Sequence, residues 1–194
     1  NPSSPVATKF SEGTIERALQ VDLDKFHPTS AQDGRWKERV AYLRGGKTHE
    51  GNGPGQFRQR SSALGDIVNS GAQYVGAPAY RTGMDKNYGS FVEANANRKP
   101  VVYIGANDGM LHAFDAKTGK EIFAYIPSWL GPKLGALTDP TYNQAGNHQA
   151  YVDASPVAGD VNVSTDADNP VWKSVLVSGT GGGGRSLRIR SFFR

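Results

Sequence analysis

The chain has 194 residues, 37% of them hydrophobic, with 24 glycines, no cysteine and a formal net charge of +4. This length fits one domain or one and a half, and the missing cysteines exclude thiolate metal sites, cysteine nucleophiles and disulfides. Four arginines in the last ten residues carry the excess charge, so the body of the chain is neutral. No basic stripe runs along it, and nucleic-acid binding is therefore not predicted. No apolar run approaches the ~20 residues that span a bilayer. The chain starts at Asn1 without a methionine, and we expect it to be a piece of a longer protein.

Residues 1–60 predict a lead-in of helices and loops. A helix is predicted over residues 12–26, with Ser11 as its N-cap and Pro28 ending it. Apolar residues at helical spacing support this helix: Ile15, Ala18, Leu19, Leu23 and Phe26. A second helix is predicted from Ala31 to Leu43. Residues 44–60 are rich in glycine and polar side chains without periodicity, which predicts a long loop.

From about Ala63 the apolar period changes to two, which indicates strands. Three strands are predicted at Val101–Gly105, Leu111–Asp115 and Glu121–Pro127. The first two are joined by Asn-Asp-Gly at residues 107–109, and the next two by Lys-Thr-Gly-Lys at residues 117–120. Both connections are short turns of residues that tolerate positive φ, so the three strands form an antiparallel meander.

The strand pattern recurs further along the chain. Short strands are predicted to begin at Ser70 and Ser155, and the apolar runs at residues 102–104 and 175–177 are the strands that follow them. Equal strands with unequal connections are typical of repeated propeller blades, in which each blade is a four-stranded meander. Residues 186–193 alternate like one more strand. We therefore predict a mainly β chain: a partial, quinoprotein-like β-propeller of about two to three blades over residues 61–194, after a helical and loop lead-in over residues 1–60.

Several segments together form a specific pattern. They are Tyr42–Gly45, LGDIVNS at residues 64–70, VVYIGANDGMLHAFD at residues 101–115, AYIPS at residues 124–128, and VDASP with Gly-Asp at residues 152–160. Across roughly residues 36–184 the chain resembles the C-terminal propeller of the PilY/PilC class of type IV pilus biogenesis factors and pilus-tip adhesins. The resemblance implies an extracytoplasmic protein at the cell surface, pilus tip or outer membrane that serves pilus extension, attachment and twitching motility. The partners it implies are minor pilins or the pilus-tip complex, with host surface or matrix proteins left open.

The resemblance also implies a calcium loop of the Asp-x-Asp-x-Asp kind in the whole protein, because spaced oxygen ligands suit this cation. The candidate ligands in this chain are Asp160, Asp166 and Asp168, which we expect in one loop. That loop lacks the turn glycine and the terminal bidentate acid of a calcium site. We therefore expect a solvated loop, no cofactor in this chain, and the calcium site of the whole protein beyond Arg194.

Two other classes of protein share parts of this pattern. The unit at residues 107–120 also resembles blades of quinoprotein dehydrogenases, which bind pyrroloquinoline quinone, but no quinone-stacking aromatic residue or adjacent cysteines accompany it. The other class is the scaffold propeller of outer-membrane-assembly lipoproteins. No histidine has metal-ligand spacing, and no Gly-x-Ser-x-Gly motif occurs. We expect a protein that binds other proteins and not an enzyme.

Aromatic residues in predicted loops are the candidates for partner binding, because tyrosine and tryptophan are favoured at interfaces. They are expected to be exposed: Tyr80, Tyr88, Trp129 and Tyr142. Trp129 follows a predicted strand end, so packing beneath the loop is an equal alternative for its side chain.

Overall fold

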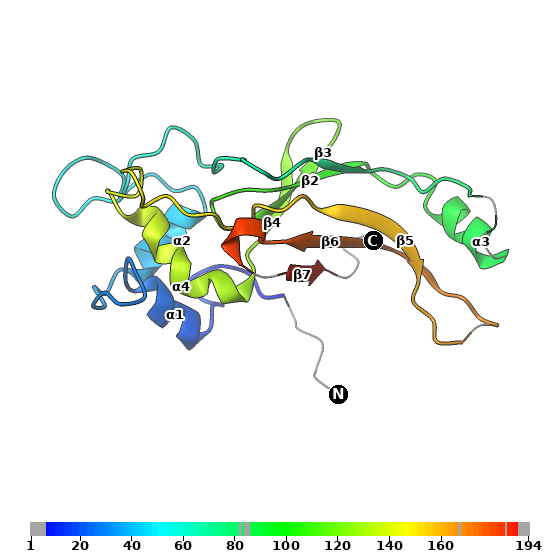
Figure 1. Ribbon diagram of the computed structural model, residues 1–194, viewed down its shortest axis with the longest axis horizontal. Helices are drawn as coiled ribbons and strands as arrows, with labels where there is room; N and C mark the ends of the chain where they lie inside the picture. The colour runs from blue at the N-terminus through cyan, green and yellow to red at the C-terminus, as the bar shows by residue number, and fades with distance from the viewer. Residues whose placement is uncertain (1–6, 82, 84–85, 167, 185, 190–194) are drawn as a thin grey trace. The chain divides into compact units, whose positions relative to one another are not determined.

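A computed structural model describes residues 7–81, 83, 86–166, 168–184 and 186–189 (Figure 1). The chain divides into two compact units. The helical unit contains the described residues up to Gly65 together with Pro127–Gln149, and the strand unit contains Asp66–Ile126 and the described residues from Ala150 onward. The sequence placed the boundary of the lead-in at residue 60 and did not predict that residues 127–149 pack with it. None of the described helices is long and apolar enough to cross a membrane.

The helical unit begins with α1 (Arg17–Leu23) and α2 (Trp36–Leu43). Both start later than the sequence predicted, because turns precede them. Thr14 N donates to Ser11 O in a turn before α1, and Gly34 takes a positive φ of 76° just before α2. After the strand unit's first sheet, the chain returns with three short helical turns: η1 (Ser128–Leu130), α4 (Gly131–Leu134) and η2 (Gly135–Thr138).

A buried arginine joins the parts of the helical unit. Arg39 of α2 is fully buried and donates to both carboxylate oxygens of Asp33, at 2.7 and 2.6 Å. It also donates to Leu23 O at the end of α1 and to Thr138 Oγ1 of η2, each at 3.1 Å. Burial alone would raise the pKa of Asp33, but the hydrogen bonds and charge of Arg39 outweigh burial and hold that pKa below its usual value. The buried charge is therefore paired and hydrogen-bonded, as an interior ion requires.

The first sheet of the strand unit is an antiparallel meander in the order β1-β2-β3-β4. Its strands are β1 (Gln73–Val75), β2 (Val101–Gly105), β3 (Leu111–Asp115) and β4 (Glu121–Tyr125). The predicted meander is confirmed, with identical bounds for β2 and β3, while β4 ends before the predicted Pro127. The turn glycines Gly109 and Gly119 have φ values of 93° and 70°, which explains why glycine closes both turns.

The second sheet has the order β5-β6-β7 and is also antiparallel. Its strands are β5 (Val157–Asn162), β6 (Trp172–Gly179) and β7 (Ser186–Ile189). The described part of the predicted strand at residues 186–193 is β7, and the rest of that prediction lies outside the described residues. Two open meanders in succession confirm a mainly β, partial propeller.

A helix that the sequence did not predict, α3 (Lys86–Ala94), lies in the connection between β1 and β2. Tyr88 and Val92 sit one helical turn apart in it, and both are buried. The sequence assigned this stretch to loops between strands, and the helical spacing of these two apolar residues was the signal that it missed. The corresponding connection between β5 and β6 is a short hairpin loop.

Strand pairing and burial confirm the predicted repeat. The predicted alignment sets Tyr74 on Gly159 and Val102 on Val175, and in the structure Tyr74 pairs with Val102 while Gly159 pairs with Val175. Burial alternates with the same phase in β2 and β6, so the aligned positions that face the interior are buried in both strands: Val101, Tyr103 and Gly105 in β2, and Ser174, Leu176 and Ser178 in β6. The β1–β2 and β5–β6 connections differ in length, but the strands that they join pair in the same way, as expected of repeated units.

The two repeats touch through the segments that lead into their first strands. Asn69 donates through its backbone N and its Nδ2 to the carboxylate of Asp153, at 3.1 and 2.7 Å. Ser70 Oγ donates to Ala154 O at 3.2 Å and accepts from Gly105 N at 2.9 Å. Gly71 N donates to Ser155 Oγ at 2.8 Å. We call these contacts between residues 69–71 and 153–155 the repeat seam.

The packing beside the repeat seam leads to a test on strand glycines. A Cβ on Gly105 of β2 would overlap Val152 O, whereas a Cβ on Gly159 of β5 would meet nothing within 4 Å. We expect Gly105→Ala to lower the free energy of unfolding by about 1–3 kcal/mol, because backbone must move to relieve the overlap. The matched Gly159→Ala variant should be unchanged or more stable by about 0.5–1 kcal/mol. Urea unfolding measures both, and equal stability of the two variants would contradict this packing.

Candidate functional site

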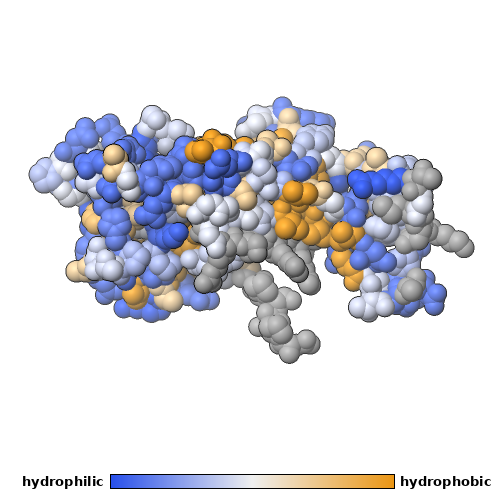
Figure 2. Space-filling model, in the orientation of Figure 1, coloured by the Kyte–Doolittle hydropathy of each residue, from blue (hydrophilic) through white to orange (hydrophobic). Residues whose placement is uncertain are grey.

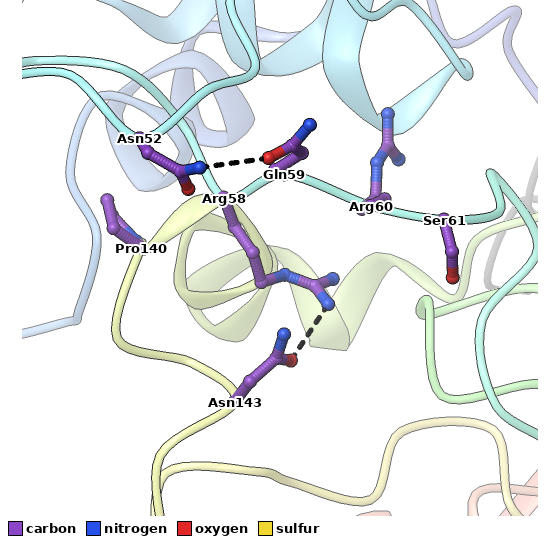
Figure 3. A pocket seen from close by; sticks show the side chains of 7 residues that line it. All are labelled: Asn52, Arg58, Gln59, Arg60, Ser61, Pro140 and Asn143. Carbon is purple, nitrogen blue, oxygen red and sulfur yellow. Dashed lines mark hydrogen bonds between the residues drawn. The ribbon is translucent and has the colours of Figure 1, made fainter.

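An open pocket of about 420 Å³ lies in the helical unit (Figure 3). One wall comes from the loop before the strand unit and the other from the segment that follows η2. Its lining residues are polar except for one proline: Asn52, Arg58, Gln59, Arg60, Ser61, Pro140 and Asn143. None of the seven is acidic, so hydrogen-bond donors dominate the wall. We call this the Arg58 pocket.

A buried phenylalanine fixes the loop that builds the pocket. Phe57 is fully buried and packs edge-to-face against Phe26 and Tyr42, with ring centroids 6.4 and 5.7 Å apart. Its backbone N donates to His49 O at 2.8 Å. The next residue, Arg58, then donates its backbone N to Thr138 O at 3.0 Å. A core contact therefore places the Arg58 side chain beside the segment after η2.

Arg60 is compensated within the protein. Its Nε donates to Glu50 Oε1 at 2.8 Å and its Nη2 to Gly46 O at 3.0 Å, while its guanidinium lies 3.5 Å from the centre of the Tyr42 ring. Burial would raise the pKa of Glu50, but the hydrogen bonds and charge of Arg60 outweigh burial and lower that pKa. Figure 3 shows the Arg60 side chain directed away from Arg58.

Arg58 is held by neutral groups only. Its Nε donates to Leu137 O at 3.0 Å and its Nη1 to Asn143 Oδ1 at 3.1 Å. The guanidinium lies 4.7 Å from the centre of the Tyr142 ring. No carboxylate within the described part of the chain forms a salt bridge with it. The pocket therefore contains a fixed guanidinium whose charge is not compensated by an acid.

The structure corrects the expected exposure of two of the four candidate aromatic residues. Tyr80 is 66% exposed, as predicted, but Tyr88 and Tyr142 are only 1% and 3% exposed. Tyr88 lies on α3, where its ring packs against Trp172 at 4.8 Å, and Tyr142 packs beneath Arg58. Trp129 lies in η1 and is half-buried. A role of any of the four in partner binding stays a prediction.

The three candidate aspartates do not share one loop. Asp160 lies in β5, where its Oδ1 accepts from Ser174 Oγ at 2.6 Å and its Oδ2 lies 2.9 Å from the Tyr88 hydroxyl. Asp166 and Asp168 lie in the β5–β6 hairpin loop, and Asp166 Oδ1 accepts from Asp168 N at 2.9 Å. No three acidic or histidine side chains group to hold a metal ion anywhere in the described ranges. Calcium binding by any of the three stays a prediction.

This arrangement predicts no response of the hairpin to calcium. Because the carboxylates of Asp160 and Asp166 are already hydrogen-bonded within the chain, millimolar Ca²⁺ should leave the thermal unfolding midpoint of the chain unchanged. Thermal unfolding with Ca²⁺, with Mg²⁺ as the control and with EDTA measures this. A rise in the midpoint that is specific to Ca²⁺ and disappears in Asp166→Asn would place calcium in the hairpin.

His112 is a buried titratable side chain of the first sheet, and the sequence analysis gave it no role. It lies in β3, is 4% exposed, and its Nδ1 lies 2.7 Å from Glu121 Oε1 of β4. Its Nε2 lies 3.1 Å from Asp108 Oδ2 in the preceding turn. Burial alone would lower the pKa of His112, but the hydrogen bonds and charges of Asp108 and Glu121 outweigh burial and raise it. When it is protonated, the ring can donate to both carboxylates and so joins the turn before β3 to strand β4.

The raised pKa of His112 gives stability a pH dependence. The stabilisation is fully present below the unfolded-state pKa of about 6.5, and it is lost as pH rises through the higher folded-state pKa. We expect the free energy of unfolding to fall across this window in the parent chain and to fall less in His112→Gln. Urea unfolding over a pH series measures this, with the exposed His148→Gln as control. Superimposable pH profiles for the parent and His112→Gln would exclude this role.

An aliphatic face covers one side of the β5–β6 hairpin. Val157 and Val177 pair across the strands and are 63% and 44% exposed, and Val161 lies further along β5 on the same face. Val163 and Val171 extend it where the hairpin ends. Figure 2 shows apolar surface gathered over β5 and β6. Apolar side chains clustered in this way are typical of surfaces that contact other proteins.

Repeated antiparallel meanders that meet through equivalent segments define part of a β-propeller. Residues 64–190 match the family model of the PilY1 beta-propeller domain. The chain belongs to this family, which confirms the resemblance to the PilY/PilC class. No solved structure matches it.

Named relatives support the same assignment. The chain is 49% identical over 156 residues to a type IV pilus biogenesis factor PilY1 homolog of Xylella fastidiosa, covering 77% of this chain and 12% of that protein. It is 42% identical over 189 residues to the type IV pilus biogenesis factor PilY1 of Pseudomonas aeruginosa strain PAK, covering 92% of this chain and 15% of that protein. The chain thus spans a small part of the length of these relatives.

Proposed function

We propose that the chain serves type IV pilus biogenesis by binding other proteins, as part of a longer protein at the cell surface. The observation that carries the proposal is membership of the PilY1 propeller family over residues 64–190, with relatives that are named type IV pilus biogenesis factors. That membership favours the pilus class over a quinoprotein dehydrogenase or an outer-membrane assembly scaffold. The proposed role is not enzymatic.

The proposed partners are minor pilins or the pilus-tip complex, with host surface or matrix proteins as partners in adhesion. Two features support binding to proteins. The valines of the β5–β6 hairpin expose apolar area on one face, and the Arg58 pocket exposes hydrogen-bond donors around a fixed cation. Protein interfaces combine apolar and polar contacts of these kinds. We place any calcium site of the whole protein outside the Asp160–Asp168 hairpin.

The proposal is tested in the bacterium that carries the gene. Deletion of the gene should reduce surface pili and twitching, and the full-length gene should restore both. A copy that lacks residues 64–190 should fail to restore them although immunoblotting shows that the protein accumulates. Sheared surface pilin measured by immunoblot reports piliation. Normal piliation with the shortened copy would refute the proposed role of this segment.

Direct binding is tested on the full-length protein. Minor pilins of the same bacterium should co-purify with the tagged full-length protein, and they should be lost from a protein without residues 64–190. Retention of the minor pilins by the shortened protein would assign that contact to another part of the molecule. Attachment assays on cells with normal piliation then separate adhesion from pilus extension.

A further inference from the structure

We propose that the Arg58 pocket binds a carboxylate carried by an acidic peptide segment of a partner protein. The inference rests on the proposed function, because it assumes that the chain works by binding proteins. It adds the chemistry of the ligand and the residue that binds it. The pocket lies in the helical unit. Five of its lining residues precede the matched propeller region at residues 64–190, and Pro140 and Asn143 lie within that region.

Among the described arginines of the helical unit, Arg58 is the one that is half-buried without an acidic partner, because Arg17 and Arg44 are exposed. Three other arginines of the helical unit each have an acidic partner: Arg35 with Glu38, Arg39 with Asp33, and Arg60 with Glu50. Arg58 is half-buried, yet its hydrogen-bond partners are only the neutral oxygens of Leu137 and Asn143. A guanidinium has five N–H donors, so donors remain for a further acceptor. A partly desolvated cation of this kind favours an anionic ligand.

The Arg58 side chain is already ordered for binding. Leu137 O anchors its Nε, and the buried Tyr142 ring lies beneath the guanidinium plane. Tyr142 is itself fixed, since its hydroxyl donates to Gln149 O at 3.2 Å. An arginine that is ordered before binding loses little conformational entropy when a carboxylate binds to its planar fork.

The size and lining of the pocket favour a peptide over a small inorganic anion. A volume of about 420 Å³ lies in the range of pockets that hold whole organic ligands. Asn52 Nδ2 donates to Gln59 Oε1, which leaves Asn52 Oδ1 as an acceptor and Gln59 Nε2 as a donor for a peptide backbone. Figure 3 shows these two amides across the pocket from Asn143, with Arg58 between them.

The test uses the 194-residue chain and two pairs of probe peptides, measured by isothermal titration calorimetry. The first pair is an N-acetylated, C-amidated peptide of alternating alanine and glutamate and its glutamine counterpart. The second pair is polyalanine of the same length with a free or an amidated C-terminus. Binding of the glutamate peptide identifies a side-chain carboxylate as the ligand, and binding of the free polyalanine identifies a chain terminus. Sodium acetate and sodium sulfate are titrated in parallel.

Four variants separate recognition from folding. Arg58→Gln should weaken binding of the acidic peptide about tenfold or more, and Arg58→Lys should weaken it less, because lysine keeps the charge without the fork. Gln59→Glu adds a carboxylate from an exposed side chain beside Arg58 and should also abolish binding. Arg17→Gln removes the same charge from an exposed site outside the pocket and should leave binding unchanged. Thermal unfolding verifies that each variant is folded.

The next three outcomes overturn the proposal. Absence of acidic-peptide binding by the parent chain at millimolar concentration would refute it, as would equal binding by the parent and by folded Gln59→Glu. Acetate or sulfate binding as tightly as the peptide would identify an inorganic-anion site only. If the parent chain does not bind the acidic peptide but the copy lacking residues 64–190 loses piliation, the proposed function is still supported. Normal piliation with that copy, together with Arg58-dependent peptide binding, would refute the proposed function alone.

Discussion

The close contact between equivalent segments of two repeats is the constraint on which the strand unit depends. At the repeat seam, Asn69 and Ser70 bind Asp153 and Ala154 directly. The hydroxyl of Ser70 also accepts from Gly105 N in β2. One side chain therefore joins the segment before β1 to strand β2 and to the next repeat. Backbone segments approach this closely only where side chains are small, and Gly105 is glycine because Val152 O occupies the space that a Cβ would need.

The insertion between β1 and β2 is tied to the second sheet by a separate polar network. Arg98 donates to Gly76 O after β1 and to Ser174 Oγ of β6, and Ser174 in turn donates to Asp160 of β5. The Tyr88 hydroxyl of α3 lies beside the same carboxylate. Asp160 therefore accepts hydrogen bonds from its own sheet and from α3, while the valine face of β5–β6 stays exposed.

In the helical unit, Arg58 differs from Arg39 and Arg60 in having no acidic partner. Arg39 and Arg60 pack against aromatic rings and bind Asp33 and Glu50, so these cations stabilise the fold. Arg58 packs on an aromatic ring in the same way but binds only neutral oxygens. A binding protein gains specificity from a fixed, uncompensated cation, since a ligand that lacks the matching acid leaves it unpaired. The pocket and the valine face are thus surfaces of different chemistry.

The sequence by itself determined the β2–β3–β4 meander, because period-two apolar runs and glycine turns are local signals. It also determined the family and the repeat, whose alignment of Val102 with Val175 matches the strand pairing. Tertiary structure alone decided that Tyr88 and Tyr142 are buried and that Asp160 accepts from Tyr88, since these contacts join segments far apart in the sequence. The Arg58 pocket was beyond sequence reasoning for the same reason, because its two walls come from distant segments that meet only when Phe57 packs into the core.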